Sequence, residues 1–361
     1  MLKFLIASLF VSITSLAQLR ERLDSLMQAT IRANQPGAAL LVQIDGETIY
    51  QAGHGMANVQ TKKPITPATN FRMASVTKQF TAMGILLLEK EKRLTLDDPI
   101  IRFFPELSGQ MARKVQVRNL LTHSSGLLDY ESLMSPNQRQ QLSDTDVLAL
   151  LKDRDSLYFE PGSQFRYSNS GYCLLALIIE RVSGQSFVSF MQERIFKPLQ
   201  MNQSTVYEAD KSIANRAMGY HKKDNTFIFS DQNITSATKG DGGIYTSLID
   251  YKKWIDALNR GTLLDLKTVL IRVEQAIRTN PVSYYGGGWF FRQPTNPVMF
   301  HSGSTCGFNN FVVAVPARKF LMIYFSNKAD NKASATSILK LLADTGHPEI
   351  ADIITLDAQT N

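Results

Sequence analysis

Apolar and polar residues alternate along the chain in a way that predicts a helix and a pair of strands near its beginning. Five apolar residues recur at helical spacing between charged positions: Leu19, Leu23, Leu26, Met27 and Ile31. This spacing predicts an amphipathic helix, which Pro36-Gly37 should stop. Residues 38–44 and 48–52 are predicted as two strands, joined by the hairpin turn signal Asp45-Gly46.

The C-terminal part of the chain repeats this pattern. Apolar runs that predict strands occupy residues 289–291, 298–300, 311–315 and 320–325, and a helical pattern follows from about 333 to 343. Strands joined by short turns favour an antiparallel sheet, which a helix at each end of the chain can cover.

Between about residues 91 and 284 the pattern changes to helical stretches broken by Pro and Gly. We therefore predict an α+β fold: residues 18–90 and 285–361 form a discontinuous region with the sheet, and residues 91–284 form a mainly helical region. No repeat, low-complexity tract or flexible linker separates the two. They should form one catalytic unit with a shared cleft, where ligand sites tend to lie.

The first 17 residues have the pattern of a secretory signal peptide. Lys3 precedes a short apolar run, and the small residues Ser15 and Ala17 suit cleavage before Gln18. The alternative is a membrane anchor, but the run is shorter than the roughly 20 residues that a spanning helix needs. We expect an exported protein, periplasmic or secreted, without a stable transmembrane anchor.

Composition narrows the choice of partners. With 361 residues, 44% of them hydrophobic, the chain can bury a large core. The net charge of +7 comes from dispersed Lys and Arg residues, which argues against a nucleic-acid partner. Cys173 and Cys306 are too few for a disulfide framework and lack metal-ligand spacing. We expect free thiols, although a disulfide between them stays open. The oligomeric state is not predicted.

Ser75-Val76-Thr77-Lys78 begins a strongly apolar predicted helix. Residues three apart share a helix face, so the Lys78 amine can reach the Ser75 hydroxyl. A serine hydroxyl becomes a good nucleophile when a neighbouring base removes its proton, and burial can make a lysine that base. By itself the pattern is also typical of a helix-capping serine with a solvated lysine.

Two further segments carry candidate chemistry. Tyr167-Ser168-Asn169 lies in a predicted loop before an apolar helix, where the tyrosine could relay a proton and the amide could orient a substrate. His301-Ser302-Gly303-Ser304 follows a predicted strand. Gly303 would let a substrate lie against the strand edge, and the Ser304 N–H could join that of Ser75 in an oxyanion hole. His301 could bind a carboxylate or take part in proton transfer. Each segment alone also fits a structural role.

Together, Ser75-x-x-Lys78, Tyr167-Ser168-Asn169 and His301-Ser302-Gly303 resemble the three active-site blocks of the class C β-lactamase and penicillin-binding-protein family, which includes D-Ala-D-Ala carboxypeptidases, D-aminopeptidases and esterases. Further stretches that resemble the family are Leu120-Leu121-Thr122-His123-Ser124-Ser125-Gly126-Leu127, Gly242-Gly243-Ile244-Tyr245-Thr246-Ser247 and Tyr285-Gly286-Gly287-Gly288-Trp289. The resemblance covers residues from about 20 to 345.

This resemblance implies a β-lactamase/transpeptidase-like fold: an antiparallel sheet flanked by helices plus an all-helical region, with the active site between them. It implies that Ser75 is acylated, that Lys78 and Tyr167 share acid and base duty, and that Asn169 orients Lys78 and the substrate. Which of the two takes the first proton stays open, because coupled groups titrate as a pair. It implies no metal or organic cofactor.

Three residues in or near these blocks are His301, His123 and Arg72. Class C β-lactamases begin the third block with Lys, whereas His301 stands here and is mostly neutral at pH 7. This difference puts efficient β-lactam hydrolysis in doubt. By the resemblance His123 belongs to scaffold rather than to the catalytic set. Arg72 could steer anions toward the cleft, but we expect it to be an exposed surface residue.

The leading hypothesis is a serine hydrolase that forms an acyl-enzyme on Ser75 and cleaves an amide, ester or lactam. A D-amino-acid peptide or ester is favoured as substrate, possible cell-wall peptides included, and a β-lactam comes second. The alternative is a penicillin-binding-like protein that is acylated, turns over poorly and acts as a sensor or binding module. A third hypothesis, a periplasmic binding protein without serine chemistry, requires all three blocks to coincide by accident.

Overall fold

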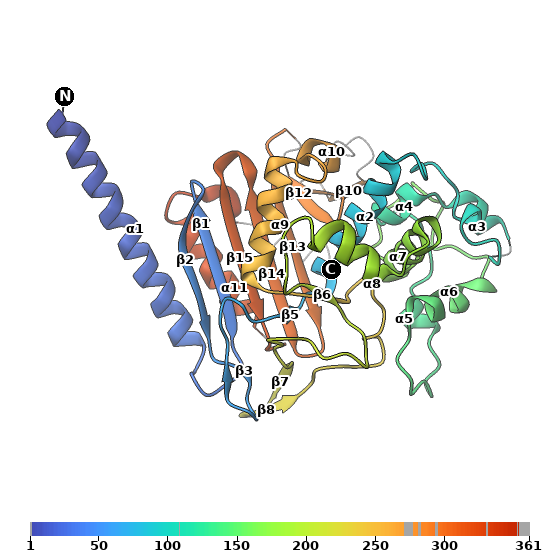
Figure 1. Ribbon diagram of the computed structural model, residues 1–361, viewed down its shortest axis with the longest axis horizontal. Coiled ribbons are helices and arrows are strands. Elements are labelled where there is room, and N and C mark those ends of the chain that lie inside the picture. The colour runs from blue at the N-terminus through green and yellow to red at the C-terminus, as the bar shows by residue number, and fades with distance from the viewer. Residues whose placement is uncertain are drawn as a thin grey trace.

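The core of the protein is an eight-stranded antiparallel sheet (Figure 1). The computed structural model describes residues 2–107, 109–270, 277–280, 283–292, 295–329, 331–351 and 353. In sheet order the strands are β10 (Ile277–Asn280), β11 (Ser283–Gly286), β12 (Trp289–Arg292), β13 (Val298–Thr305), β14 (Phe308–Val315), β15 (Phe320–Ser326), β1 (Ala38–Ile44) and β2 (Glu47–His54). The two ends of the chain meet where β1 pairs with β15, for example at Ala38 and Ser326.

The antiparallel sheet and its predicted strands are confirmed. The hairpin between β1 and β2 turns at Asp45 and Gly46, both with positive φ (+51° and +90°), as a two-residue hairpin requires. The sequence pattern did not reveal β10 and β11. The sheet therefore begins at Ile277, ahead of the boundary expected at residue 285, because a strand of four residues is too short to show a clear alternation.

Helices cover both faces of the sheet (Figure 1). On β15, Phe325 packs against Tyr251 of α9 (Leu248–Arg260), with ring centroids 5.4 Å apart. The neighbouring Tyr324 points to the other face, where its hydroxyl accepts a hydrogen bond from Asn331, just before α11 (Lys332–Ala343). All seven residues of β15 are buried, as expected for a strand covered on both sides.

Helix α1 (Leu2–Thr30) contacts α11 and β2. Its residues Leu19, Leu23, Met27 and Ile31 just beyond it are buried, which confirms the predicted amphipathic helix. The N-terminal part of α1 extends away from the sheet (Figure 1). Removal of residues 1–17 as a signal peptide stays a prediction.

Helix α2 (Lys78–Lys90) joins the sheet to the helical region. It packs on α7 (Asn169–Ser183) so closely that a Cβ on Gly84 would lie 2.7 Å from Ile179. On another side its Phe80 ring lies 4.5 Å from that of Trp254 on α9. A displacement of α2 would therefore disturb both parts of the molecule.

The remaining elements of the middle region are short. The helices are α3 (Gln110–Lys114), α4 (Val117–Leu121), α5 (Tyr130–Leu133), α6 (Asp144–Lys152), α8 (Phe187–Met191) and α10 (Leu266–Leu270). Small sheets add β6 (Thr205–Val206), β7 (Tyr220–Lys223), β8 (Thr226–Phe229) and β9 (Ile244–Thr246) in this region, and β3 (Met56–Asn58), β4 (Lys63–Pro64) and β5 (Phe71–Arg72) ahead of it. The middle of the chain is thus mainly helical but also contains strands.

Among the described residues, no single helix has the length and apolar composition to cross a membrane. The bent pair of helical segments Asn169–Ser183 and Phe187–Phe196 has that length and composition only when the two are taken together.

Cys173 and Cys306 are free thiols, as expected, and Cys173 is buried.

We predict that Leu23→Ala lowers the free energy of unfolding by about 2 to 5 kcal/mol, because Leu23 is completely buried and its removal leaves a cavity. Denaturant unfolding measures this change. The control is Ser25→Ala, an exposed position on the same helix. A Leu23→Ala protein as stable as the control would mean that α1 does not pack on the sheet as described.

Candidate active site

Ser75 lies in a tight turn of backbone directly before α2. The preceding strand β5 is fixed by pairing with β9, and the short 3₁₀ helix η1 (Ala74–Thr77) then leads into α2. Ala74 has φ +49°, a left-handed conformation that residues with a side chain rarely adopt. Backbone strain of this kind often occurs at functional sites, and here it lies next to the predicted nucleophile.

The Lys78 side chain is completely buried, and its amine is held by three hydrogen bonds. Nζ lies 3.0 Å from Ser75 Oγ, 2.9 Å from Asn169 Oδ1 and 3.0 Å from the backbone oxygen of Asp241. The first contact is the one that the Ser75-x-x-Lys78 spacing predicts. The other two come from the start of α7 and from the loop before β9, so distant segments converge on one amine.

Tyr167 lies beside this amine. Its ring centroid is 4.8 Å from Lys78 Nζ, and its buried hydroxyl has no hydrogen-bond partner in the part of the chain that the structure describes. Leaving a buried hydroxyl without a hydrogen-bond partner costs free energy. A molecule bound at the site that exchanges a proton with the Tyr167 hydroxyl would supply that partner. The structure thus brings Ser75, Lys78, Tyr167 and Asn169 together, as predicted.

His123 holds the backbone on both sides of Tyr167. Its carbonyl accepts a hydrogen bond from the N–H of Arg166 (2.9 Å), and its Nδ1 accepts one from the N–H of Ser168 (3.1 Å). The imidazole is fully buried, with its ring centroid 4.1 Å from that of Tyr167. Burial lowers the pKa of His123 well below its usual value, so Nδ1 stays available as an acceptor. His123 is scaffold, as the resemblance implied, but scaffold that positions Tyr167.

Gly303 allows strand β13 to lie against the Ser75 turn. A Cβ at this position would lie 2.3 Å from the oxygen of Met73 and 3.3 Å from the nitrogen of Ser75. No larger residue fits without moving the backbone, so the glycine sets the distance between the strand and the nucleophile. This close approach explains why the third block requires a glycine here.

His301 is buried and neutral. Its Nδ1 lies 2.6 Å from the oxygen of Ser302 and its Nε2 lies 3.4 Å from the Tyr285 hydroxyl. Burial lowers the pKa of His301 to about 3. The side chain therefore supplies no positive charge at neutral pH, and it does not line the cavity described next. Its contact with a substrate stays a prediction.

A cavity of about 150 Å³ adjoins Ser75. Its lining residues are Arg72, Ala74, Ser75, Tyr130, Glu131, Asn169, Thr235, Thr238, Asp241, Gly242, Ser304 and Thr305. Three of the predicted site residues, Ser75, Asn169 and Ser304, are among them. A larger open hollow of about 830 Å³ lies between α1 and α11 and is lined by none of these residues.

Sequence reasoning missed two carboxylates in this wall. Glu131 Oε1 accepts a hydrogen bond from Asn169 Nδ2 at 2.7 Å, and Asp241 contributes its backbone oxygen to Lys78. Burial raises the pKa of Glu131, and the Asn169 hydrogen bond opposes that rise. The only signal in the sequence was position. Glu131 lies just after the family-like stretch that ends at Leu127, and Asp241 lies just before the one that begins with Gly242-Gly243.

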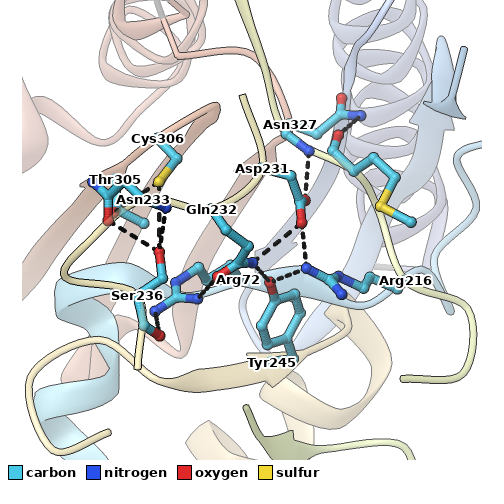
Figure 2. A network of polar contacts seen from close by, with 12 residues as sticks. Arg72, Arg216, Asp231, Gln232, Asn233, Ser236, Tyr245, Thr305, Cys306 and Asn327 are labelled. Atoms are coloured by element: carbon cyan, nitrogen blue, oxygen red, sulfur yellow. Dashed lines mark hydrogen bonds and ion pairs between the residues drawn. The ribbon is translucent and has the colours of Figure 1, made fainter. Parts of the chain in front are cut away.

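Arg72 was expected to be exposed, and this is wrong: it is 2% exposed. Its Nη1 donates to Gln232 Oε1 at 2.9 Å and its Nη2 to the oxygen of Ser236 at 2.8 Å (Figure 2). Gln232 in turn donates to Asp231, which forms an ion pair with Arg216. The two terminal guanidinium nitrogens thus have oxygen acceptors, which lets the charged side chain be buried, while Nε has no hydrogen-bond partner among the described residues.

Comparison with known proteins places the whole arrangement in one family. The family model described as Beta-lactamase matches residues 19–347. Penicillin-binding protein 4* of Bacillus subtilis (strain 168) is 29% identical over 340 residues, which are 89% of this chain and 74% of that protein. Protein flp of Staphylococcus aureus (strain MW2) is 27% identical over 85% of this chain, but the match spans only 63% of that protein.

A solved structure agrees with the fold. The penicillin-binding protein from Bacillus halodurans superposes with a TM-score of 0.76 at 26% identity, covering 89% of this chain and 98% of that one. The predicted β-lactamase/transpeptidase-like fold is therefore confirmed.

Because His301 is buried and neutral, the free energy of unfolding should depend on pH. Between pH 6.5 and about 3 the unfolded chain binds a proton on this histidine and the folded protein does not. The free energy of unfolding should therefore fall as the pH falls through this window, by up to about 1.4 kcal/mol per pH unit from this group. Denaturant unfolding at several pH values should show a shallower slope for His301→Gln than for wild type. The control His221→Gln should keep the wild-type slope, and equal slopes for all three proteins would contradict a neutral buried His301.

Proposed function

Because the chain belongs to the Beta-lactamase family of serine hydrolases, we propose that it hydrolyses an amide or ester through an acyl-enzyme formed on Ser75. The observation that carries the proposal is the hydrogen bond between the buried Lys78 amine and Ser75 Oγ. D-amino-acid peptides or esters are the favoured substrates, and β-lactams come second because His301 supplies no positive charge at neutral pH.

The contacts of Lys78 support its role as base. A neutral amine has two hydrogens and one lone pair. Two of its three neighbours, Asn169 Oδ1 and the Asp241 oxygen, can only accept hydrogen bonds. With both hydrogens so occupied, the lone pair points to Ser75 Oγ. The hydroxyl can then give its proton to Lys78 as Oγ attacks the carbonyl carbon of the substrate.

The remaining steps use Tyr167 and backbone N–H groups. The Ser75 and Ser304 N–H groups stabilise the oxyanion of the tetrahedral intermediate. When it collapses, the bond between the acyl carbon and the leaving group breaks, and the leaving nitrogen or oxygen takes, through Tyr167, the proton that Lys78 received from Ser75. Water then attacks the ester on Ser75, its hydroxyl stays on the acid product, and its other proton returns to Ser75 Oγ.

The first test compares Ser75→Ala with the wild type on 4-nitrophenyl acetate, D-alanine p-nitroanilide and a chromogenic cephalosporin. We expect kcat/KM on the accepted substrate to fall at least about 10³-fold, since the nucleophile is lost. Ser163→Ala, an exposed position, serves as control. Equal hydrolysis by Ser75→Ala and the control would refute the proposal, whereas one acylation per molecule without turnover would favour the sensor or binding-module alternative.

A second prediction concerns His123. His123→Phe keeps a ring beside Tyr167 but removes the acceptor for the Ser168 N–H. We expect kcat to fall on the order of 10- to 100-fold with KM little changed, because Tyr167 is no longer held in place. His123→Asn should recover part of kcat, since asparagine accepts a hydrogen bond and tolerates the φ of +56°. A loss confined to KM, or no recovery with asparagine, would speak against a positioning role.

A further inference from the structure

The wall of the cavity beside Ser75 contains two carboxylates that no cation neutralises. Glu131 and Asp241 both line this cavity. Neither takes part in any of the ion pairs between described residues, although such pairs form at many other places in the chain. A carboxylate that is withdrawn from water and unpaired is unstable in its charged form.

Asp241 is the more deeply buried of the two. It is 7% exposed, and its Oδ1 has no hydrogen-bond partner among the described residues. Asp144 and Cys173 lie close to it: a carboxylate oxygen of each aspartate and the Cys173 Sγ are all within 4.8 Å of one another. Burial, together with the charge of Asp241, raises the pKa of Asp144 to about 7. The Asp241 charge therefore opposes the ionisation of Asp144, and a cation bound beside them would relieve this repulsion.

Glu131 connects the carboxylates to the catalytic groups. Its Oε1 accepts a hydrogen bond from Asn169 Nδ2, while Asn169 Oδ1 accepts one from Lys78. A ligand bound at Glu131 thus lies one side chain away from the Lys78 amine. The two basic side chains of the site have other partners: Lys78 has three hydrogen bonds to oxygen, and Arg72, which also lines the cavity, donates to Gln232 and Ser236.

We propose that Glu131 and Asp241 bind a protonated amino group of the substrate, so that the enzyme acts on amides or esters of amino acids or short peptides whose α-amino group is free. This inference rests on the proposed acyl-enzyme function and names its substrate class. An ammonium group supplies three donors and the positive charge that the two carboxylates lack. A volume of about 150 Å³ suits a small head group of this kind.

The test uses two substrates that differ at the amino group: D-alanine p-nitroanilide, which is charged there, and its N-acetyl derivative, which is neutral and larger. The measured quantity is the ratio of kcat/KM for the free amine to kcat/KM for the acetylated compound. We expect a ratio well above 1 for wild type and a fall of roughly 10- to 100-fold in Glu131→Gln and in Asp241→Asn, the range of a hydrogen bond to a charged group. A ratio cancels any general loss of activity that follows when Asn169 shifts.

Glu47→Gln is the matched control, because Glu47 is an exposed carboxylate on β2 and should leave the ratio unchanged. A wild-type ratio at or below 1, or a ratio that neither Glu131→Gln nor Asp241→Asn lowers, would overturn the inference.

A binding measurement separates this inference from the proposed function. Calorimetric titration of Ser75→Ala with D-alaninamide and with N-acetyl-D-alaninamide needs no catalysis. Tighter binding of the free amine, weakened by Glu131→Gln, supports the amine site even if hydrolysis fails. If instead 4-nitrophenyl acetate is cleaved in a Ser75-dependent manner and both amides bind equally, the hydrolase stands and the amine site is refuted.

Discussion

The active site of this protein depends on the burial of one amine, that of Lys78. Lys78 is inaccessible to solvent, and an amine in such a place is tolerated only when nearby groups replace the water it has lost. Those groups come from three separate segments: the Ser75 turn, the start of α7 and the loop before β9. The sheet, α2 and the helical region must therefore be assembled together before the site exists.

The surroundings of the amine set the chemistry. Two of its oxygen neighbours can only accept hydrogen bonds, which leaves Ser75 as the natural proton donor. Close packing fixes the geometry: Gly303 brings β13 against the Ser75 turn, and His123 holds the backbone on both sides of Tyr167. The cavity side is polar and carries Glu131 and Asp241, neither of which forms an ion pair with another described residue. A rigid apolar support thus presents a charged, polar surface to the substrate.

Much of this could be predicted from local patterns. Long strands such as β1 and β15 appear as apolar runs, and the helical spacing of Ser75 and Lys78 predicts their hydrogen bond because it depends on four consecutive residues. The four-residue strands β10 and β11 were missed because so short a segment shows no clear period. The burial of Arg72 was also missed, since its partners Gln232 and Ser236 lie about 160 residues further along the chain.

The roles of Glu131 and Asp241 were hidden for the same reason: nothing in their local sequence distinguishes a carboxylate in a cavity wall from one on the surface. The measurement that tests the central claim most directly is the rate at which a fluorophosphonate labels the protein, with the adduct located by peptide mass spectrometry. We expect a single adduct on Ser75 and labelling at least about 10³-fold slower in Lys78→Arg, because a guanidinium cannot accept the Ser75 proton. An adduct on another residue, or equally fast labelling of Lys78→Arg, would contradict the assignment of Ser75 and Lys78 as nucleophile and base.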